Sequence, residues 1–550
     1  MKKLLYVLPL ALTLCSCSDF LDVDSNSVMD AESYKINTED EARYAMFGVL
    51  QQLQKVADRY VVLGELRADL LTTTDNASQD LRDIVMFEAT GENEYQVESD
   101  LYAVINNCNY LLSRIDTTVL ATNSSGERIK VLKYEMAQAV AIRAWSYLQL
   151  ALTYGEVSYY TTPILDVDDS KSVEDAETLS LDGLLPVLTA DLQAWVPDNS
   201  EEVEIFPNYG TIGDYSASQL FLPVRVLLGD LYLLQNQYEK AAELYYAHLL
   251  SNKLLVLNYR NGWSDNTFTR VSTKNWTRLF STSSEMQSLI QGSEEYIAGL
   301  QHLQEMFDAS DDYLLAPASN AIALFDNQTY AYSATVTTPG DLRGEYGTYA
   351  YANKAVGDAD LQVPYVSKYK NLSQTVILYR TSDVYLHYAE AINRLGKHNM
   401  AFAFLKYGLN ADVLTTNAYC PASEWQDADG NVVPYLDFGQ SNLNYATIFA
   451  DNVGMHSRGC GAGLNLYRSY AIESGVDSLL FVEGLLLDEM ALETAFEGNR
   501  FADILRISHH RNDPSFVAST IAAKYGSAKA AMLAKLEDAK NWYLPHQENE

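Results

Sequence analysis

The carboxylates best spaced for acid–base chemistry stand near the C-terminal end of the chain. Glu489, Glu493 and Glu497 recur every four residues, which places them on one face of a helix. A glycoside hydrolase needs two carboxylates about 5–10 Å apart across a cleft. Three glutamates on one helix beside Arg500 and Arg506 predict a face held by salt bridges instead.

Other motifs with a known chemical mechanism are absent from the sequence. It contains no HExxH, GxSxG or GxxxxGK[ST] pattern, and the glycines at 459, 461 and 463 predict a tight loop, not a GxGxxG turn. No Cys/His set has zinc-ligand spacing. The segment 427–431 (DADGN), between Trp425 and Val432, predicts a hairpin turn. A calcium loop is disfavoured there because the later bidentate glutamate is missing. His509 and His510 suit the end of a helix. We therefore expect no enzyme activity, metal or cofactor.

Three tryptophans stand among polar residues, a combination that suits sugar binding. The C–H face of a sugar ring stacks on a flat aromatic ring, and its hydroxyls need amide, carboxylate or guanidinium partners. Trp263, within 258–266 (NYRNGWSDN), is the first candidate, followed by Trp276 and Trp425. The remaining tryptophans lie in apolar patterns and are expected in the core: Trp145, Trp195 and Trp542.

Composition excludes several classes of protein. The 550 residues carry 38 Lys+Arg against 73 Asp+Glu, a net charge of −35, which repels nucleic acid. Hydrophobic residues make up 48% and charged residues 20%, so a long disordered chain is excluded.

The N-terminus predicts export and a lipid anchor. Lys2 and Lys3 precede the apolar stretch 4–14, which is too short to span a bilayer and is typical of a signal peptide. The following Leu-Cys-Ser-Cys resembles a bacterial lipoprotein box with Cys17 as the first mature residue. We expect a signal peptide over 1–16, a lipidated tether over 17–40, and one domain over 41–550. Acyl chains on Cys17 would hold the protein on a membrane.

Three cysteines remain in the mature chain. Cys108 lies in a helical pattern and is expected to be a buried thiol. Cys420 and Cys460 lie in loop-like sequence and could pair, but their spacing alone does not decide this.

Apolar residues at three- and four-residue spacing predict a mostly helical protein. Two segments, 217–250 and 381–409, read as helix–turn–helix units with small alanines at the crossing, similar to tetratricopeptide (TPR) repeats. Further helices are expected at 101–116, 129–154 and 179–195. Loop-rich, partly β insertions are expected near 255–380 and 410–470.

Seven segments, in order from end to end, resemble the SusD/RagB family of nutrient-binding lipoproteins of Bacteroidetes. They are 17–22 (CSDFLD), 64–70 (GELRADL), 105–109 (INNCN), 143–157 (RAWSYLQLALTYGEV), 379–396 (YRTSDVYLHYAEAINRLG), 493–501 (ETAFEGNRF) and 541–545 (NWYLP).

The resemblance implies a fold of four TPR-like helix pairs with an irregular, loop-rich face. It implies an outer-membrane, cell-surface lipoprotein that captures oligo- or polysaccharide without catalysis. Its expected partner is a SusC-like TonB-dependent transporter, to which the glycan is delivered.

The resemblance also implies where the ligand binds. One contributor is the loop over 71–82, which offers Asp75 and Asn76 but no aromatic residue. The other is the insertion after the second repeat region, with Trp263, Trp276, Tyr330 and Tyr346 among its rings.

Three alternatives remain open. The aromatic-poor 71–82 loop would suit a peptide-binding member of the family, a glycoside hydrolase would need a facing carboxylate pair, and a pure TPR scaffold would have no small ligand. The acidic surface disfavours anionic glycans unless a basic pocket forms from Arg67, Arg260, Arg270 or Arg343.

Overall fold

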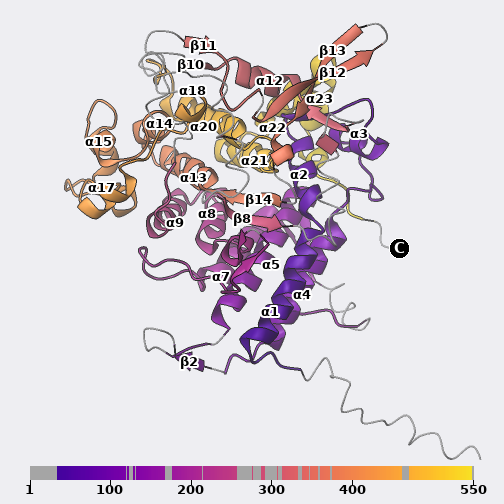
Figure 1. The fold of residues 1–550 in the computed structure, drawn as a ribbon, viewed down its shortest axis with the longest axis vertical. Helices are drawn as coiled ribbons and strands as arrows, with labels where there is room; N and C mark the ends of the chain where they lie inside the picture. The colour runs from indigo at the N-terminus through magenta and orange to yellow at the C-terminus, as the bar shows by residue number, and fades with distance from the viewer. Residues whose placement is uncertain are drawn as a thin grey trace, which may run out of the picture.

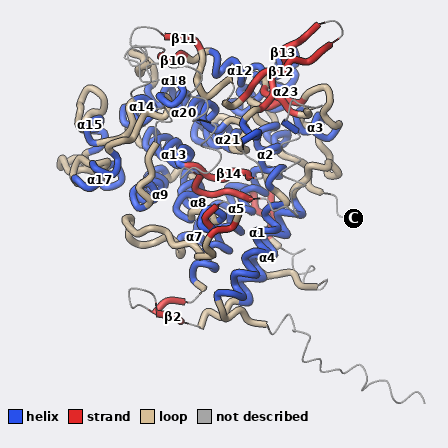
Figure 2. The backbone as a smooth tube through the Cα atoms, in the orientation of Figure 1, coloured by secondary structure: helices blue, strands red, loops and turns tan. Residues whose placement is uncertain are grey.

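Helices dominate the fold, and its strands are short and paired (Figure 2). The computed structural model describes residues 34–118, 120–122, 128–130, 132–166, 176–213, 215–256, 276, 286–291, 306–307, 313–331, 337–345, 347–356, 359–371, 375–460 and 470–547. The mostly helical class with a partly β insertion face is confirmed.

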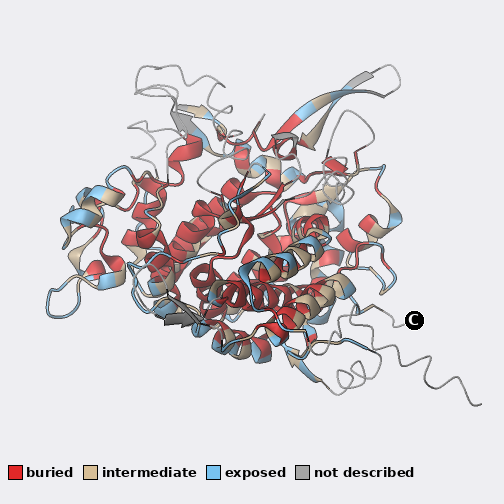
Figure 3. Ribbon diagram, turned by 60° about the horizontal axis from the view of Figure 1, so that its bottom comes forward, coloured by how far each residue is buried: buried red, intermediate tan, exposed pale blue. Residues whose placement is uncertain are grey.

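Eight helices pack side by side in chain order and form the body of the molecule (Figure 1). They are α1 (Glu39–Gln54), α4 (Glu98–Arg114), α5 (Lys133–Tyr154), α7 (Leu181–Gln193), α8 (Val224–Leu234), α9 (Tyr238–Ser251), α13 (Thr381–Arg394) and α14 (His398–Lys406). Their facing side chains make one continuous buried cluster, concentrated in the central helices (Figure 3). The helical segments expected from the apolar spacing are all present.

Local chemistry sets where these helices begin and end. Gly155 has φ +84°, which only glycine adopts at low cost, and its N–H closes α5 on Ala151.

The pair α8–α9 crosses closely at Gly229, where a Cβ would lie 2.6 Å from the Tyr245 ring. The stretch 217–223 is not part of α8 as expected, because Pro223 disfavours the helical conformation of the residue before it.

Further helices continue the body and carry the loop face. They are α2 (Ala57–Leu66), α3 (Gln79–Val85), α12 (Ser319–Asp326), α15 (Ala411–Leu414), α16 (Ala422–Trp425), α17 (Leu443–Phe449), α18 (Ser457–Cys460), α20 (Ser478–Thr494), α21 (Arg500–Arg511), α22 (Ser515–Ala522) and α23 (Lys529–Leu536), with 3₁₀ turns η1 (Ala217–Leu220), η3 (Lys368–Asn371), η4 (Pro434–Leu436), η5 (Ala523–Ala528) and η6 (Ala539–Trp542).

All described strands form antiparallel pairs. The pairs are β1 (Leu71–Thr73) with β9 (Leu315–Pro317), β2 (Leu120–Thr122) with β3 (Arg128–Lys130), β4 (Glu156–Tyr159) with β5 (Glu177–Ser180), β6 (Thr211–Ile212) with β7 (Tyr215–Ser216), β8 (Met286–Gln291) with β14 (Thr375–Arg380), β10 (Thr329–Ala331) with β11 (Thr337–Pro339), and β12 (Tyr349–Val356) with β13 (Ala359–Val366).

The folded body begins earlier than the expected tether boundary at residue 40. Ile36 is buried, and its backbone bonds to Arg114 and Asp116. Thr38 and Glu41 form a capping box that starts α1. In the described part of the chain, the stretch Ala217–Leu234 is long and apolar enough to cross a membrane, but 83% of it is buried inside the protein.

A buried ionic network lies at the C-terminal end of α20. Glu489, Glu493 and Glu497 are all buried, as expected of a salt-bridged face, but their partners are not Arg500 and Arg506. Those two arginines pair with Asp69, Glu390 and Asp503 instead. Glu497 also lies beyond the helix, since α20 ends at Thr494 and Phe496 has φ +68°.

The cations of this network come from four separate segments of the chain. Arg343 contacts Glu489 at 2.6 Å and Glu493 at 2.8 Å, and it also pairs with Asp341. Arg458 of α18 bonds Glu493. Arg380 of β14 bonds Glu493 at 3.2 Å and Glu497 at 2.8 Å, and Lys368 of η3 bonds Glu497 at 2.8 Å. Four carboxylates therefore face these four cations in the interior, and His456 Nδ1 also lies 2.6 Å from Glu489.

Removing one member of this network should destabilise the fold strongly. We expect Glu493→Ala to lower the free energy of unfolding by about 3–5 kcal/mol, because Arg343, Arg380 and Arg458 would lose a buried counter-charge. Urea denaturation measures this loss. Glu537→Ala, at an exposed carboxylate, is the control and should change stability by less than about 0.5 kcal/mol. A loss below about 1 kcal/mol for Glu493→Ala would contradict the prediction.

The same carboxylate predicts acid sensitivity. Burial raises the pKa of Glu493, but Arg458, Arg380 and Arg343 outweigh burial and hold that pKa at about 2. Because this pKa lies below the ordinary value of 4.5, the stabilisation is complete above about pH 4.5 and is lost as the pH falls towards 2. Urea unfolding at pH 7 to 2.5 should show a shallower pH dependence for Glu493→Gln than for the wild type. An equally steep fall of stability with pH in the two proteins would refute the role of Glu493 in acid sensitivity.

Candidate functional site

Two segments were predicted to contribute to a ligand site: the 71–82 loop and the insertion near 255–380. Their described parts meet on the loop face, at the end of the molecule away from α1 and α7 (Figure 1). Strand β1 pairs with β9, which joins the start of the 71–82 loop to the insertion. Thr74 extends this contact, because its backbone N–H donates to Leu314 O at 2.8 Å and its hydroxyl donates to Tyr313 O at 2.6 Å.

Asp75 and Asn76 are exposed at the tip of this junction. The Asp75 carbonyl accepts a hydrogen bond from Arg82, and the Asn76 N–H donates to the Thr74 hydroxyl. The backbone of the loop is therefore fixed, while both residues remain exposed. Their role as ligand contacts stays a prediction.

The hairpin β12–β13 projects from the loop face beside this junction. Tyr313 connects the two, since its hydroxyl donates to Pro364 O of β13 at 3.0 Å. Along the hairpin, Tyr351 lies opposite Pro364, and Asn353 lies opposite Gln362. Residues two apart in a strand share a face, so Tyr349, Tyr351 and Asn353 line one side of the hairpin.

A row of aromatic rings runs from the core to the exposed end of this face. Phe325 of α12 is buried and packs 5.7 Å from the Tyr349 ring, which meets the Tyr351 ring edge-on at 5.9 Å. The Tyr349 hydroxyl donates to Asp326 at 3.0 Å. Tyr351 is 38% exposed, so it presents a ring held in place from behind.

Two exposed amides lie on the same face of the hairpin as Tyr351. The Gln362 amide donates to the Asn353 side-chain oxygen across the strands. Burial, and then Asp326 and Glu345, raise the pKa of the Tyr351 phenol, so this hydroxyl remains a neutral donor at physiological pH. A flat ring beside two amides matches the requirements of a sugar contact. We define Tyr351, Asn353 and Gln362 as the hairpin site.

These three residues were not among the ligand contacts predicted from the sequence. A usable signal was present, because 349–356 and 359–366 flank Gly357-Asp358, a pair typical of hairpin turns. The alternation of side chains along a strand would then have placed Tyr351 and Asn353 on the same face of the hairpin. Tyr330 and Tyr346 were predicted as ligand contacts instead. The backbone of Tyr330 lies in β10, but its side chain and all of Tyr346 lie outside the described residues.

The tryptophan candidates are not brought together at this face. Trp263 lies outside the described residues. Trp276 is 3% exposed and sits over the ionic network, 5.8 Å from Lys368 and 5.7 Å from Arg380. Trp425 is 8% exposed in α16. For Trp276 and Trp425 the expectation of an accessible ring is corrected, because packing covers both. Trp145 and Trp542 are in the core, as expected, and Trp195 packs against it half-buried.

The cysteines do not form the disulfide that the sequence allowed. Cys420 and Cys460 are both free and buried, as is Cys108. Cys460 lies 3.2 Å from His456 Nε2, beside the ionic network. The loop expected at Gly459 is a short helix, α18, and Gly461 and Gly463 lie outside the described residues.

The predicted hairpin turn over 427–431 is confirmed. The backbone of Asp427 pairs with that of Asn431, and the Asp427 carboxylate accepts hydrogen bonds from the N–H groups of Asp429 and Asn431. At the end of α21, His510 bonds Glu390 and Asn236. Among the described residues, no group of three or more His, Cys, Asp or Glu side chains could hold a metal ion.

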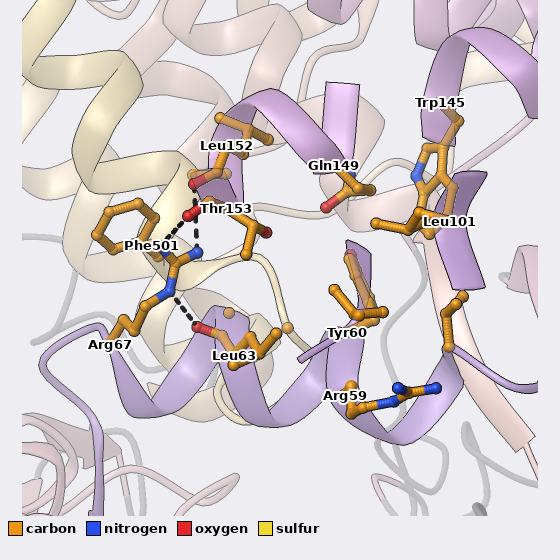
Figure 4. Close-up of a pocket in the computed structure, with 15 residues that line it drawn as sticks. Arg59, Tyr60, Leu63, Arg67, Leu101, Trp145, Gln149, Leu152, Thr153 and Phe501 are labelled. Atoms are coloured by element: carbon orange, nitrogen blue, oxygen red, sulfur yellow. Dashed lines mark hydrogen bonds between the residues drawn. The ribbon is translucent and has the colours of Figure 1, made fainter. Parts of the chain in front are cut away.

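A pocket inside the body, shown in Figure 4, has Arg67 among its lining residues. It holds only about 30 Å³, enough for a few water molecules but not a sugar ring. Arg67 donates to the carbonyls of Leu63, Leu152 and Thr153 and stacks on Phe501 at 4.2 Å. Burial lowers the pKa of Arg67 to about 10.

Of the four arginines that could have formed a basic pocket for anionic glycans, the two described ones do not come together. Arg67 lies in the body and Arg343 in the ionic network, both buried and hydrogen-bonded. Arg260 and Arg270 lie outside the described residues.

Comparisons with known proteins agree with this architecture. The model of the SusD family matches residues 259–407. SusD-like protein P38 of Formosa agariphila is 25% identical over 429 residues, covering 70% of this chain and 76% of that protein. A SusD superfamily protein from Bacteroides thetaiotaomicron superposes with a TM-score of 0.56 at 14% identity, covering 86% of this chain and 89% of the other. A SusD-like carbohydrate binding protein from Bacteroides vulgatus gives 0.53 at 14% identity, covering 86% and 84%. The chain is therefore similar to the SusD family over residues 259–407 and has the fold of the solved SusD superfamily proteins.

Proposed function

We propose that this protein is a non-catalytic, cell-surface lipoprotein that captures oligo- or polysaccharide and passes it to a SusC-like TonB-dependent transporter. The observation that carries the glycan-binding part is the hairpin site, where the anchored ring of Tyr351 stands beside the amides of Asn353 and Gln362. A relative of the same fold is named as a carbohydrate binding protein, which supports the same ligand class.

Glycoside hydrolase activity is less well supported than glycan binding. Catalysis would need a carboxylate free to take or give a proton. Glu489, Glu493 and Glu497 are buried and paired with cations, which lower the pKa of each against the effect of burial. Such carboxylates stay ionised and reach no substrate, so we assign them to the scaffold.

Peptide binding is the second candidate function, and it rests on the 71–82 loop. That loop offers an exposed carboxylate and amide, Asp75 and Asn76, without any aromatic ring. These groups could bond a peptide backbone as readily as sugar hydroxyls. Short peptides therefore belong in the same binding assay as the glycans.

The hairpin site can be tested by affinity electrophoresis against neutral and acidic polysaccharides. We expect one glycan class to retard the soluble chain that starts after Cys17, and Tyr351→Ala to weaken binding at least about tenfold, or about 1.4 kcal/mol. Trp263→Ala tests the first candidate from the sequence in the same gels.

Tyr44→Ala is the matched control for this experiment. It removes an exposed ring from α1, at the opposite end of the molecule, and should leave retardation unchanged. Equal retardation of the wild type and Tyr351→Ala would refute the hairpin site. Binding of peptides alone would support the second candidate.

Lipid anchoring predicts the behaviour of a Cys17→Ala variant in the native host. We expect the wild type to fractionate with the outer membrane and to incorporate labelled fatty acid. The variant should appear in the soluble fraction without label, because each buried CH₂ of an acyl chain contributes about 0.8 kcal/mol to anchoring. A variant that stays fully membrane-bound and labelled would show that another residue carries the anchor.

A further inference from the structure

A second concave surface lies beside α8 and α9, in the helical body and apart from the hairpin site. It is a cleft of about 700 Å³, in the size range of small-ligand sites. Its walls are the segment 203–210, the turn η1, the end of α9 and the start of β8. In Figure 1, α8 and α9 lie well below the hairpin β12–β13, so one small ligand does not reach both.

Among the described residues, the lining of this cleft carries a single charged side chain, although the whole chain has a net charge of −35. Six described lining residues carry amides or hydroxyls: Asn208, Ser216, Ser218, Gln219, Asn252 and Gln287. Glu204 is the one charged residue among the described lining residues, and it is buried. Amides and hydroxyls both donate and accept hydrogen bonds, as the hydroxyls of a ligand require. The absence of a cation from this lining disfavours phosphate or carboxylate ligands.

A histidine with an unused nitrogen stands in the cleft wall. His248 Nδ1 lies 3.2 Å from the Glu204 carboxylate, whose other oxygen accepts a hydrogen bond from Arg225 N at 3.1 Å. A carboxylate only accepts hydrogen bonds, so it fixes the proton on Nδ1. Nε2 is buried and has no hydrogen-bond partner among the described residues. Buried polar atoms are rarely left unpaired, so this nitrogen is suited to accept a hydrogen bond from a water molecule bound behind the cleft wall.

Apolar groups complete the cleft. Phe206 is half-buried, and the buried Pro207 and Pro223 also belong to the lining. Val203 and Ile205 are about half exposed at the rim, at 48% and 53%. This combination offers a surface for the C–H face of a sugar opposite a set of neutral hydrogen-bonding groups.

We propose that this cleft is a second saccharide-binding site, which takes a neutral mono- or short oligosaccharide through its amides and hydroxyls. The inference rests on the proposed function for its ligand class, but not on the hairpin site. Two sites on one protein can hold one long glycan, and the second contact then forms at high effective concentration.

Isothermal titration calorimetry with neutral linear tri- to hexasaccharides of the malto, cello, xylo and manno series tests the cleft. We expect two binding events per wild-type chain for the recognised series. Ser218→Trp places a bulky side chain in the cleft and should weaken one event at least tenfold, while Tyr351→Ala should remove the other. Ser519→Trp, at an exposed position on α22, is the matched control and should keep both.

The outcomes separate the two sites. One event that is lost in Tyr351→Ala and unchanged in Ser218→Trp overturns the cleft and leaves the hairpin site. One event that is lost in Ser218→Trp alone supports the cleft and overturns the hairpin site. No heat with any series contradicts both. Circular dichroism checks that each variant folds, and Ser216→Trp, at the exposed edge of the same wall, replaces Ser218→Trp if that variant does not.

Discussion

Burying charge is the physical constraint on which this fold depends. Glu489, Glu493 and Glu497 lie in the interior, where an unpaired carboxylate would cost several kcal/mol. Each must therefore be met by a cation, and those cations are supplied by segments far apart in sequence. The body and the insertions can reach their native arrangement only when Arg343, Lys368, Arg380 and Arg458 converge on the end of α20. The network thus specifies one arrangement, whatever its net contribution to stability.

The ionic network also positions the hairpin site, because a short segment of the chain connects the two. Arg343 precedes Tyr349, the first residue of β12, by six positions. The turn between them is closed by hydrogen bonds from Thr348 and Tyr349 to the Gly344 carbonyl. The ring row from Phe325 to Tyr351 starts at Tyr349, so the exposed ring is positioned by a turn that the network holds. A binding ring that is fixed before the ligand arrives loses little entropy on binding.

The sequence predicted the helical body well because its signals are local. Apolar spacing located α4, α5 and α7, and it located the turns between α8 and α9 and between α13 and α14. It also predicted salt bridges for Glu489 and Glu493, but not their partners, since Arg343 and Arg458 approach only through tertiary contacts. The accessible rings were missed for the same reason. Polar neighbours suggested exposure for Trp276, yet its neighbours in space are the network cations. Tyr351 is exposed because it lies in the projecting strand pair β12–β13. The spacing of residues in the sequence does not reveal that this pair projects from the core.

The central claim is that saccharide binds across the hairpin β12–β13. Hydrogen–deuterium exchange of the soluble protein, with and without a saturating recognised oligosaccharide, tests it directly. Peptides covering 349–366 should exchange more slowly in the bound state, and the neighbouring 71–82 loop should follow. Binding that leaves the exchange of 349–366 unchanged would contradict the account.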